Sequence, residues 1–164
     1  MFERESLLGF FVCPWWQEQG ESRCVAVFDG RERGVGGLAD IRDAELILHL
    51  YELRREATLR QAREWFMHQC NPKNAEELSQ LIPPGSDANR FFRMVTSYWD
   101  MAASFLVRGA VDEQLFLDNC GECLMVWRKL APIADALRTQ RKAPRYLANV
   151  EEVFRRFEAR RAAQ

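Results

Sequence analysis

The stretch DANRFFRMVTSYWDMAASFLVRG, residues 87–109, decides the fold. Its apolar residues recur every three or four positions and fill two neighbouring stripes of a helix, which leaves a narrow polar line. The line consists of Arg90, Arg93, Ser97, Asp100, Ser104 and Arg108. A helix this apolar must be surrounded by other helices. The stretch therefore predicts an all-α bundle with a buried central helix, capped at its start by Ser86 or Asp87.

Upstream of this stretch, residues 40–70 predict one long helix of about seven turns. Asp40 and Asp43 resemble a capping box in which Asp replaces Glu. The polar side is expected to hold Arg42, Glu45, His49, Glu52, Glu56, Arg60 and Arg63, and the buried side Ala44, Ile47, Leu48, Tyr51, Ala62, Trp65 and Phe66. After Asn71-Pro72, a short helix over residues 75–81 is expected to stop at Pro83.

Downstream, Asp112 is a predicted cap for a fourth helix with one buried seam. The seam has alternating spacings of four and three: Phe116, Cys120, Cys123, Trp127, Leu130, Ala134 and Leu137. Pro132 should kink or break this helix, because its ring clashes with the carbonyl four residues earlier. A last helix is expected to open at Pro144 and to direct Leu147, Val150, Phe154 and Phe157 inward. The count is about five helices.

One domain, preceded by an irregular segment, is predicted. Residues 1–39 contain Pro14 and several glycines, among them Gly34, Gly36 and Gly37, without helical periodicity, so we expect an irregular, poorly ordered or loosely packed segment, with one short strand over residues 24–28. Translation starting near Val35 or Leu38 is a sharper hypothesis for this segment. Residues 40–164 form the predicted helical bundle domain.

The composition is that of a globular protein. Of 164 residues, 48% are hydrophobic and 29% charged, and the net charge is −1. Five cysteines, an odd number, favour reduced thiols and a cytoplasmic protein. No run approaches the roughly 20 apolar residues that span a bilayer, and the apolar run 7–13 follows acidic residues, unlike a signal peptide. No membrane association is predicted.

The polar line of the central helix supplies the first candidate site. Burying Arg93, Ser97, Asp100 and Ser104 without partners would be costly. They either form an internal Arg–Asp network that fixes the register of the helices, or line a small ligand pocket between helices.

The cysteines supply a second candidate. His68 and Cys70 together with Cys120 and Cys123 give the four N and S ligands of a tetrahedral zinc site. Cys120 and Cys123 also match a redox spacing, but they follow about two turns of helix and share the apolar seam. Buried cysteines serving as small hydrophobic residues are the alternative, and no cofactor is predicted.

Two further groups of charged residues are candidates. His49 beside Glu45 and Glu52 is a conceivable acid–base set, although a solvated helix face explains it as well. Residues 128–164 carry ten Lys and Arg against four Asp and Glu. This basic end, including Arg138, Lys142, Arg155, Arg156, Arg160 and Arg161, suits phosphates or a solvated surface.

Two segments carry a resemblance to a known family. They are AELILHLYELRRE with REWF, in residues 44–66, and VTSYWDMAAS with GAVD and LF, in residues 95–116. Over about residues 40–155 the chain resembles a family of bacterial helical proteins known only as a domain of unknown function. The resemblance implies an all-α fold and brings no activity, cofactor or site residue.

No nucleophile elbow or phosphate loop is present, so an enzyme is not favoured. The leading hypothesis is a non-enzymatic module that acts through protein contacts, by self-association or regulation. The alternatives are a helical bundle, with or without enzymatic activity, that binds a small molecule or metal, and nucleic-acid binding by the basic end.

Overall fold

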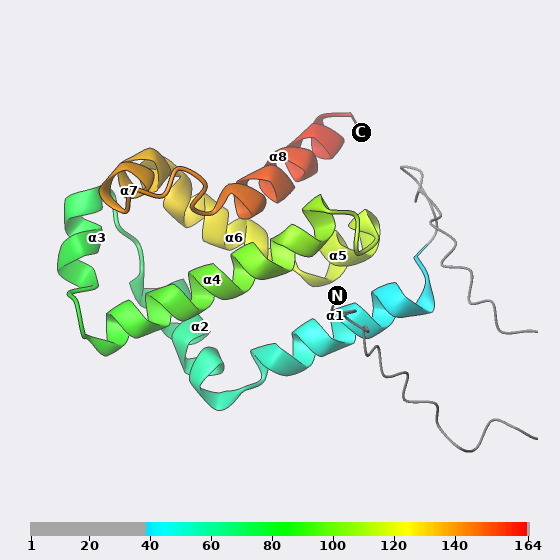
Figure 1. Ribbon diagram of the computed structural model, residues 1–164, viewed down its shortest axis with the longest axis horizontal. Helices are drawn as coiled ribbons and strands as arrows, with labels where there is room; N and C mark the ends of the chain where they lie inside the picture. The colour runs from blue at the N-terminus through cyan, green and yellow to red at the C-terminus, as the bar shows by residue number, and fades with distance from the viewer. Residues whose placement is uncertain (1–38, 164) are drawn as a thin grey trace, which may run out of the picture. The chain divides into compact units, whose positions relative to one another are not determined.

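The predicted central helix is α4, Asp87–Val107, in the computed structural model, which describes residues 39–163 (Figure 1). Ser86 caps it, because its Oγ accepts a hydrogen bond from the Asn89 backbone N–H. After its last turn Gly109 adopts a φ of +69°, a conformation that glycine takes without strain. The predictions for residues 1–38, namely an irregular segment, a strand at 24–28 and a start near Val35 or Leu38, concern residues outside this description.

Within residues 39–163 the fold is all-α, as predicted, and without strands. The elements are α1 Ile41–Arg54, α2 Ala57–Gln69, α3 Ala75–Leu81, α4 Asp87–Val107, α5 Glu113–Asn119, α6 Gly121–Leu130, the 3-10 helix η1 Ala131–Ile133, α7 Ala134–Gln140 and α8 Ala148–Ala162. No helix in this range is both long and apolar enough to cross a membrane.

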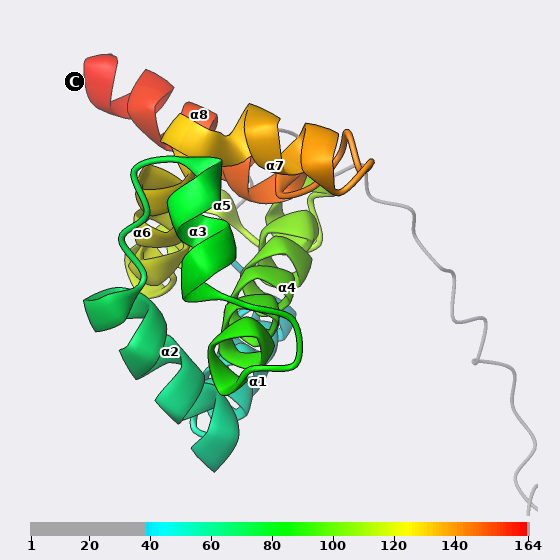
Figure 2. The same cartoon turned by 90° about the vertical axis from the view of Figure 1, so that its left-hand side faces the viewer.

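Helix α4 lies at the centre of the described helices. It packs mainly against α2 and α8, which lie on different sides of it, with α6 as a third neighbour (Figures 1 and 2). Its buried side chains are Phe92, Val95, Thr96, Tyr98, Trp99, Ala102, Ala103 and Leu106. Met101, predicted in an apolar stripe, is exposed instead.

The long first helix was predicted wrongly as one piece. The capping box of Asp40 and Asp43 is present, but α1 ends at Arg54 and α2 starts at Ala57. Glu56 caps α2 by accepting from the Leu59 N–H at 2.7 Å, and the chain changes direction there (Figure 1). The sequence has no glycine or proline at this bend. The helical spacing of apolar residues therefore continues through it and predicts a single helix.

The bend changes which face of α1 is buried. Asp43, Ile47, Leu50 and Arg54 are buried, whereas Ala44, Leu48 and Tyr51, predicted inward, are exposed. On α2 the prediction is confirmed for Ala62 and Phe66, which are fully buried.

The predicted fourth helix is also divided. Asp112 caps α5 as predicted, by accepting from the Leu115 N–H. The chain breaks at Cys120, which the periodicity did not reveal, and at η1, where Pro132 was expected to break it. Every residue of the predicted seam is nevertheless buried.

Lys129 on α6 joins the downstream helices to α2. Its ammonium donates to the carbonyls of Phe66, Met67 and Cys70 and to the Asn71 side chain, at 2.6 to 3.3 Å. These carbonyls lie at the C-terminal end of α2, where no further helical N–H can reach them. Partial burial lowers the pKa of Lys129.

Helix α8 starts four residues later than predicted, at Ala148 instead of Pro144. Leu147 precedes it with a φ of +58°, in the left-handed region, and makes no side-chain cap. Leu147 and Val150 are buried, as predicted.

Candidate functional site

The polar line of α4 was the first candidate site, and its residues differ in how far they are exposed to solvent. Arg93 and Ser97 are exposed, while Asp100 and Ser104 are half-buried. The hydroxyls of Ser97 and Ser104 donate to the carbonyls of Met94 and Met101 in their own helix.

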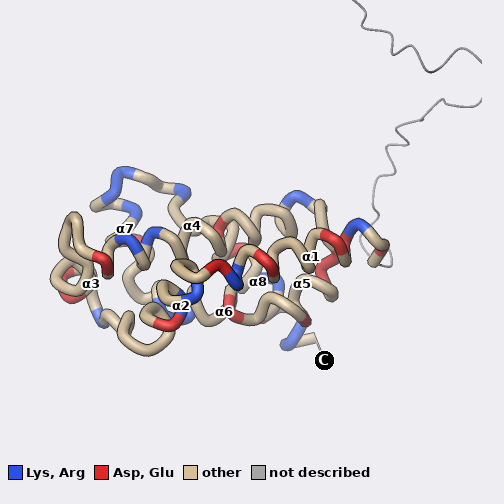
Figure 3. The backbone as a smooth tube through the Cα atoms, turned by 90° about the horizontal axis from the view of Figure 1, so that it is seen from below, with Lys and Arg blue, Asp and Glu red and all other residues tan. Residues whose placement is uncertain are grey.

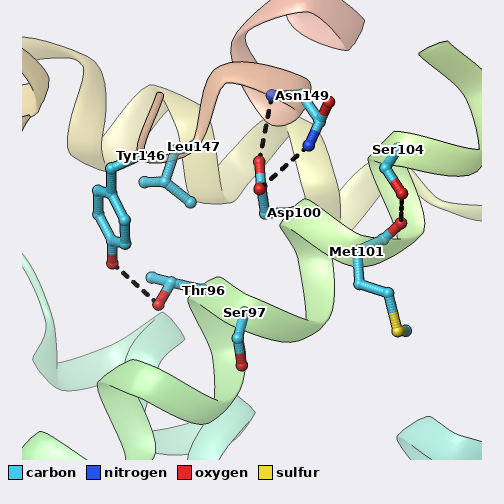
Figure 4. Close-up of a pocket in the computed structure, with 8 residues that line it drawn as sticks. All are labelled: Thr96, Ser97, Asp100, Met101, Ser104, Tyr146, Leu147 and Asn149. Carbon is cyan, nitrogen blue, oxygen red and sulfur yellow. Dashed lines mark hydrogen bonds between the residues drawn. The ribbon is translucent and has the colours of Figure 1, made fainter. Parts of the chain in front are cut away.

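Asp100 makes a contact that was not predicted. Its carboxylate accepts from the Asn149 N–H at 3.1 Å, from the Asn149 side chain at 3.1 Å and from the Val150 N–H at 3.4 Å (Figure 4). Asp100 on α4 therefore supplies the N-terminal cap of α8 that Leu147 lacks. The predicted pairing of Arg93 with Asp100 does not form among the described residues.

A hollow of about 360 Å³ brings together three of the four predicted ligand-binding residues (Figure 4). Its lining consists of Thr96, Ser97, Asp100, Met101, Ser104, Tyr146, Leu147 and Asn149. The Tyr146 hydroxyl donates to Thr96 Oγ1 at 3.0 Å, and Thr96 donates to the Phe92 carbonyl. Arg93 is not part of it and lines a second hollow with Ser97. The first hollow is thus built around hydrogen bonds that join α4 to α8.

The four proposed metal ligands are not gathered. Cys70, Cys120 and Cys123 are free and buried, and His68 is exposed on α2. Within residues 39–163, no three His, Cys, Asp or Glu side chains lie close enough to share a metal ion. Burial raises the pKa of the Cys70 and Cys120 thiols to about 11, and that of Cys123 further. Such thiols are poor nucleophiles at neutral pH.

The conceivable acid–base set lies on the surface of α1. His49 Nδ1 is 3.5 Å from a Glu52 oxygen, and both side chains are mostly exposed. Glu45 is exposed as well. A general acid or base works best where water is excluded, and this group has no such enclosure.

Glu122, in the first turn of α6, connects three helices. Its carboxylate accepts from Arg63 Nε at 2.9 and 3.0 Å, from Arg63 Nη2, and from the Trp99 indole N–H at 3.1 Å. Arg63 also donates to the Arg54 carbonyl across the bend between α1 and α2. The Glu122 hydrogen bonds raise the pKa of Arg63. Arg63 was predicted to face solvent, and helical spacing carries no signal for a pair 59 residues apart.

Arg54 lies beside this cluster and is 9% exposed. Its guanidinium carbon is 5.1 Å from the centre of the Tyr51 ring and 5.4 Å from that of Trp99. Among residues 39–163, its Nε has no hydrogen-bond partner. Arg54 thus supports the Tyr51 ring from within the protein by a cation–π contact.

The outer face of α1 carries an apolar stripe of Ile41, Ala44, Leu48 and Tyr51. All four are exposed; the exposed fractions are 75% for Ile41, 63% for Leu48 and 53% for Tyr51. Their spacings of three, four and three place them on one side of the helix, along about 15 Å of its length. We call this surface the α1 stripe.

The family model for the domain of unknown function DUF4760 matches residues 39–157. The chain belongs to this family. No curated protein and no solved structure matches the chain. The DUF4760 region begins just before α1 and ends within α8, so it contains both the α1 stripe and the Glu122 cluster.

The basic end of the DUF4760 chain is largely paired within the protein. Arg138 donates to Glu151, Asp135 and the Tyr146 carbonyl. Arg155 and Arg156 share Glu152, and Arg156 and Arg160 both approach Glu113. Arginines with these acidic neighbours offer a weaker field to a phosphate backbone than their number suggests.

Proposed function

We propose that the DUF4760 domain is a protein-interaction module that docks a partner on the α1 stripe. The observation that supports the proposal is the exposure of Ile41, Leu48 and Tyr51 along one line of a helix whose opposite side is packed into the protein. Single exposed leucines are common on protein surfaces and need no explanation. A continuous line of them is the pattern by which one helix recognises another.

Tyr51 is the expected anchor of this contact. Tyrosine and arginine are enriched among the residues that dominate binding energy. Because Arg54, which also lies over the Trp99 ring, already supports the Tyr51 ring from below, less side-chain freedom is lost when a partner covers it.

Photocrosslinking tests the proposal in the host cell. A photoreactive residue at Leu48 should give a discrete adduct with one protein, and the mass of the adduct tells another protein from a second copy of the chain. The adduct should disappear when Ile41→Ser is added, because that change removes apolar surface from the same stripe.

Met125 on α6 provides the matched control, since it is also an exposed apolar helical residue. A photoreactive residue at Met125 should give no such adduct, and Met125→Ser should leave the Leu48 adduct intact. If the photoreactive residue at Leu48 forms the same adducts with and without Ile41→Ser, the proposal is rejected.

A further inference from the structure

The two edges of the α1 stripe differ in charge and in burial. Glu45 follows Ile41 by four residues and Glu52 follows Leu48 by four, so both lie along one edge of the stripe. The other edge adjoins buried Ile47 and Arg54. The exposed charges near the stripe are Asp40, Glu45, Glu52 and Glu56, against Arg42 and Arg55. Figure 3 shows acidic positions along α1.

From this asymmetry we infer that the partner is an amphipathic helix that carries Lys or Arg beside its apolar face. The inference rests on the proposed function and names the chemistry of the occupant. Lys or Arg opposite Glu45 and Glu52 would be attracted to the stripe and would fix the direction of the docked helix. An acidic helix would be repelled by the same two carboxylates.

A second copy of the chain fits the stripe poorly. In an antiparallel pair of α1 helices, each helix presents the same edge to its partner, so Glu45 of one copy would face Glu52 of the other. In a parallel pair the Glu edge would meet the edge next to buried Ile47, where a carboxylate would lose water without gaining a partner.

A lipid surface fits it poorly as well. Helices that lie in a membrane interface carry Lys and Arg beside their apolar face, and these bind anionic headgroups. Glu45 and Glu52 occupy that place on α1 and would be repelled by the same headgroups.

Two synthetic peptides test the inference on the full chain. Each has about 18 residues, or about five helical turns, with Leu at the apolar heptad positions. One carries Lys at the flanking positions and the other carries Glu. The Lys peptide should bind at least about tenfold more tightly, a difference in binding free energy of about 1.4 kcal/mol. This preference should shrink as salt rises from about 0.05 M to about 0.5 M.

Substitutions distinguish the contribution of charge to peptide binding from that of apolar surface. Glu45→Gln with Glu52→Gln should reduce the preference for the Lys peptide by at least about threefold. Glu64→Gln with Glu76→Gln removes two exposed acids on α2 and α3 and should leave the preference unchanged. Leu48→Ser should weaken binding of the Lys peptide by about tenfold, and Met125→Ser should not.

The outcomes distinguish the two proposals. Equal, Leu48-dependent binding of both peptides would keep the docking surface and overturn the basic partner. Absence of Leu48-dependent binding of either peptide up to about 1 mM would overturn both. A Leu48-dependent dimer seen by light scattering, or Leu48-dependent binding to phosphatidylglycerol vesicles, would replace the basic helix with a second copy or a lipid surface.

Discussion

Glu122 shows how much one side chain can connect in a small helical protein. It receives hydrogen bonds from Arg63 on α2 and from Trp99 on α4, and it belongs to α6. The side chains of Glu122 and Arg63 are 15% and 26% exposed, so water screens their attraction less than it would on the surface. Replacing Glu122 leaves the Arg63 charge and the Trp99 indole N–H without an acceptor of equal strength.

Glu122→Gln is therefore expected to lower the free energy of unfolding by about 2–3 kcal/mol, measured by urea denaturation. Glu152→Gln is the control, because Glu152 pairs with Arg155 and Arg156 on the outside of α8. Its loss should stay below about 1 kcal/mol. Equal losses in the two variants would mean that Glu122 contributes no more than a surface ion pair.

The buried thiols predict alkaline destabilisation. Cys70 and Cys120 have pKa values of about 11 in the folded chain against an ordinary value of 9.0. Above about pH 9 the unfolded chain loses these protons and the folded chain keeps them, so the unfolded chain binds fewer protons and stability falls as pH rises. The fall is expected to be about 1.4 kcal/mol per pH unit for each thiol, between about pH 9 and 11.

Urea denaturation across that range measures this effect, and Cys120→Ala should show a shallower fall than the parent protein. The variant removes one titrating group but leaves the other alkaline groups in place. Identical slopes would show that the Cys120 thiol titrates alike in the folded and unfolded chains.

At the scale of the elements, local signals in the sequence predicted some helix ends and missed others. The side chains of three capping residues, Asp40, Ser86 and Asp112, accept hydrogen bonds from N–H groups two or three residues ahead. Their capping role could therefore be predicted from the sequence alone. The bend at Glu56 has no glycine or proline, and apolar spacing runs through it and through the break at Cys120, where only Gly121 marks the division. The start of α8 was missed because its cap comes from Asp100, 49 residues earlier.

Asp100→Ala should uncap α8 at a cost of about 1–2 kcal/mol in unfolding free energy. The amides of Asn149 and Val150, which donate to Asp100, should exchange with solvent faster in hydrogen-exchange experiments. Ser97→Ala, one turn away on the same polar line, removes only a bond to its own helix and should cost less than about 0.5 kcal/mol. Unchanged exchange at Asn149 in Asp100→Ala would contradict the capping role.

The candidate site was predicted only in part, because some of its residues are neighbours on one helix and others are far apart in the sequence. Spacing identified Ser97, Asp100 and Ser104 as neighbours on one line, and the hollow brings them together. The opposite wall, Tyr146 to Asn149, depends on how α8 lies against α4, and no local pattern encodes that placement. The α1 stripe was missed because apolar spacing marks a helix face without stating whether this protein or a partner covers it.

On the scale of the whole molecule, the described helices differ in how firmly they are held. Helix α4 packs against α2, α6 and α8, whereas α1 packs chiefly against α5 and α2. We expect α1 amides to exchange through local opening, at a lower free energy than α4 amides, which should exchange only when the whole domain unfolds. Native-state hydrogen exchange measures both. Equal opening free energies in α1 and α4 would mean that the helices unfold as one unit.

The α1 stripe can be changed without loss of the fold. Leu48→Ser should alter the free energy of unfolding by less than about 0.5 kcal/mol, because the side chain is mostly exposed. Thermal and urea denaturation check this. A larger loss would show that Leu48 stabilises the domain itself and would remove it as a specific probe of docking.

The cap that Asp100 provides to α8 imposes an order of events on folding. A helix that carries its own capping residue can begin to form as soon as its first turns exist, but α8 receives its cap from another helix. During synthesis α4 leaves the ribosome before α8. The Asp100 carboxylate can accept hydrogen bonds from Asn149 and Val150 only after these residues have also been made. The first turn of α8 is thus completed by docking and not before it, so its formation reports that the two halves of the domain have met.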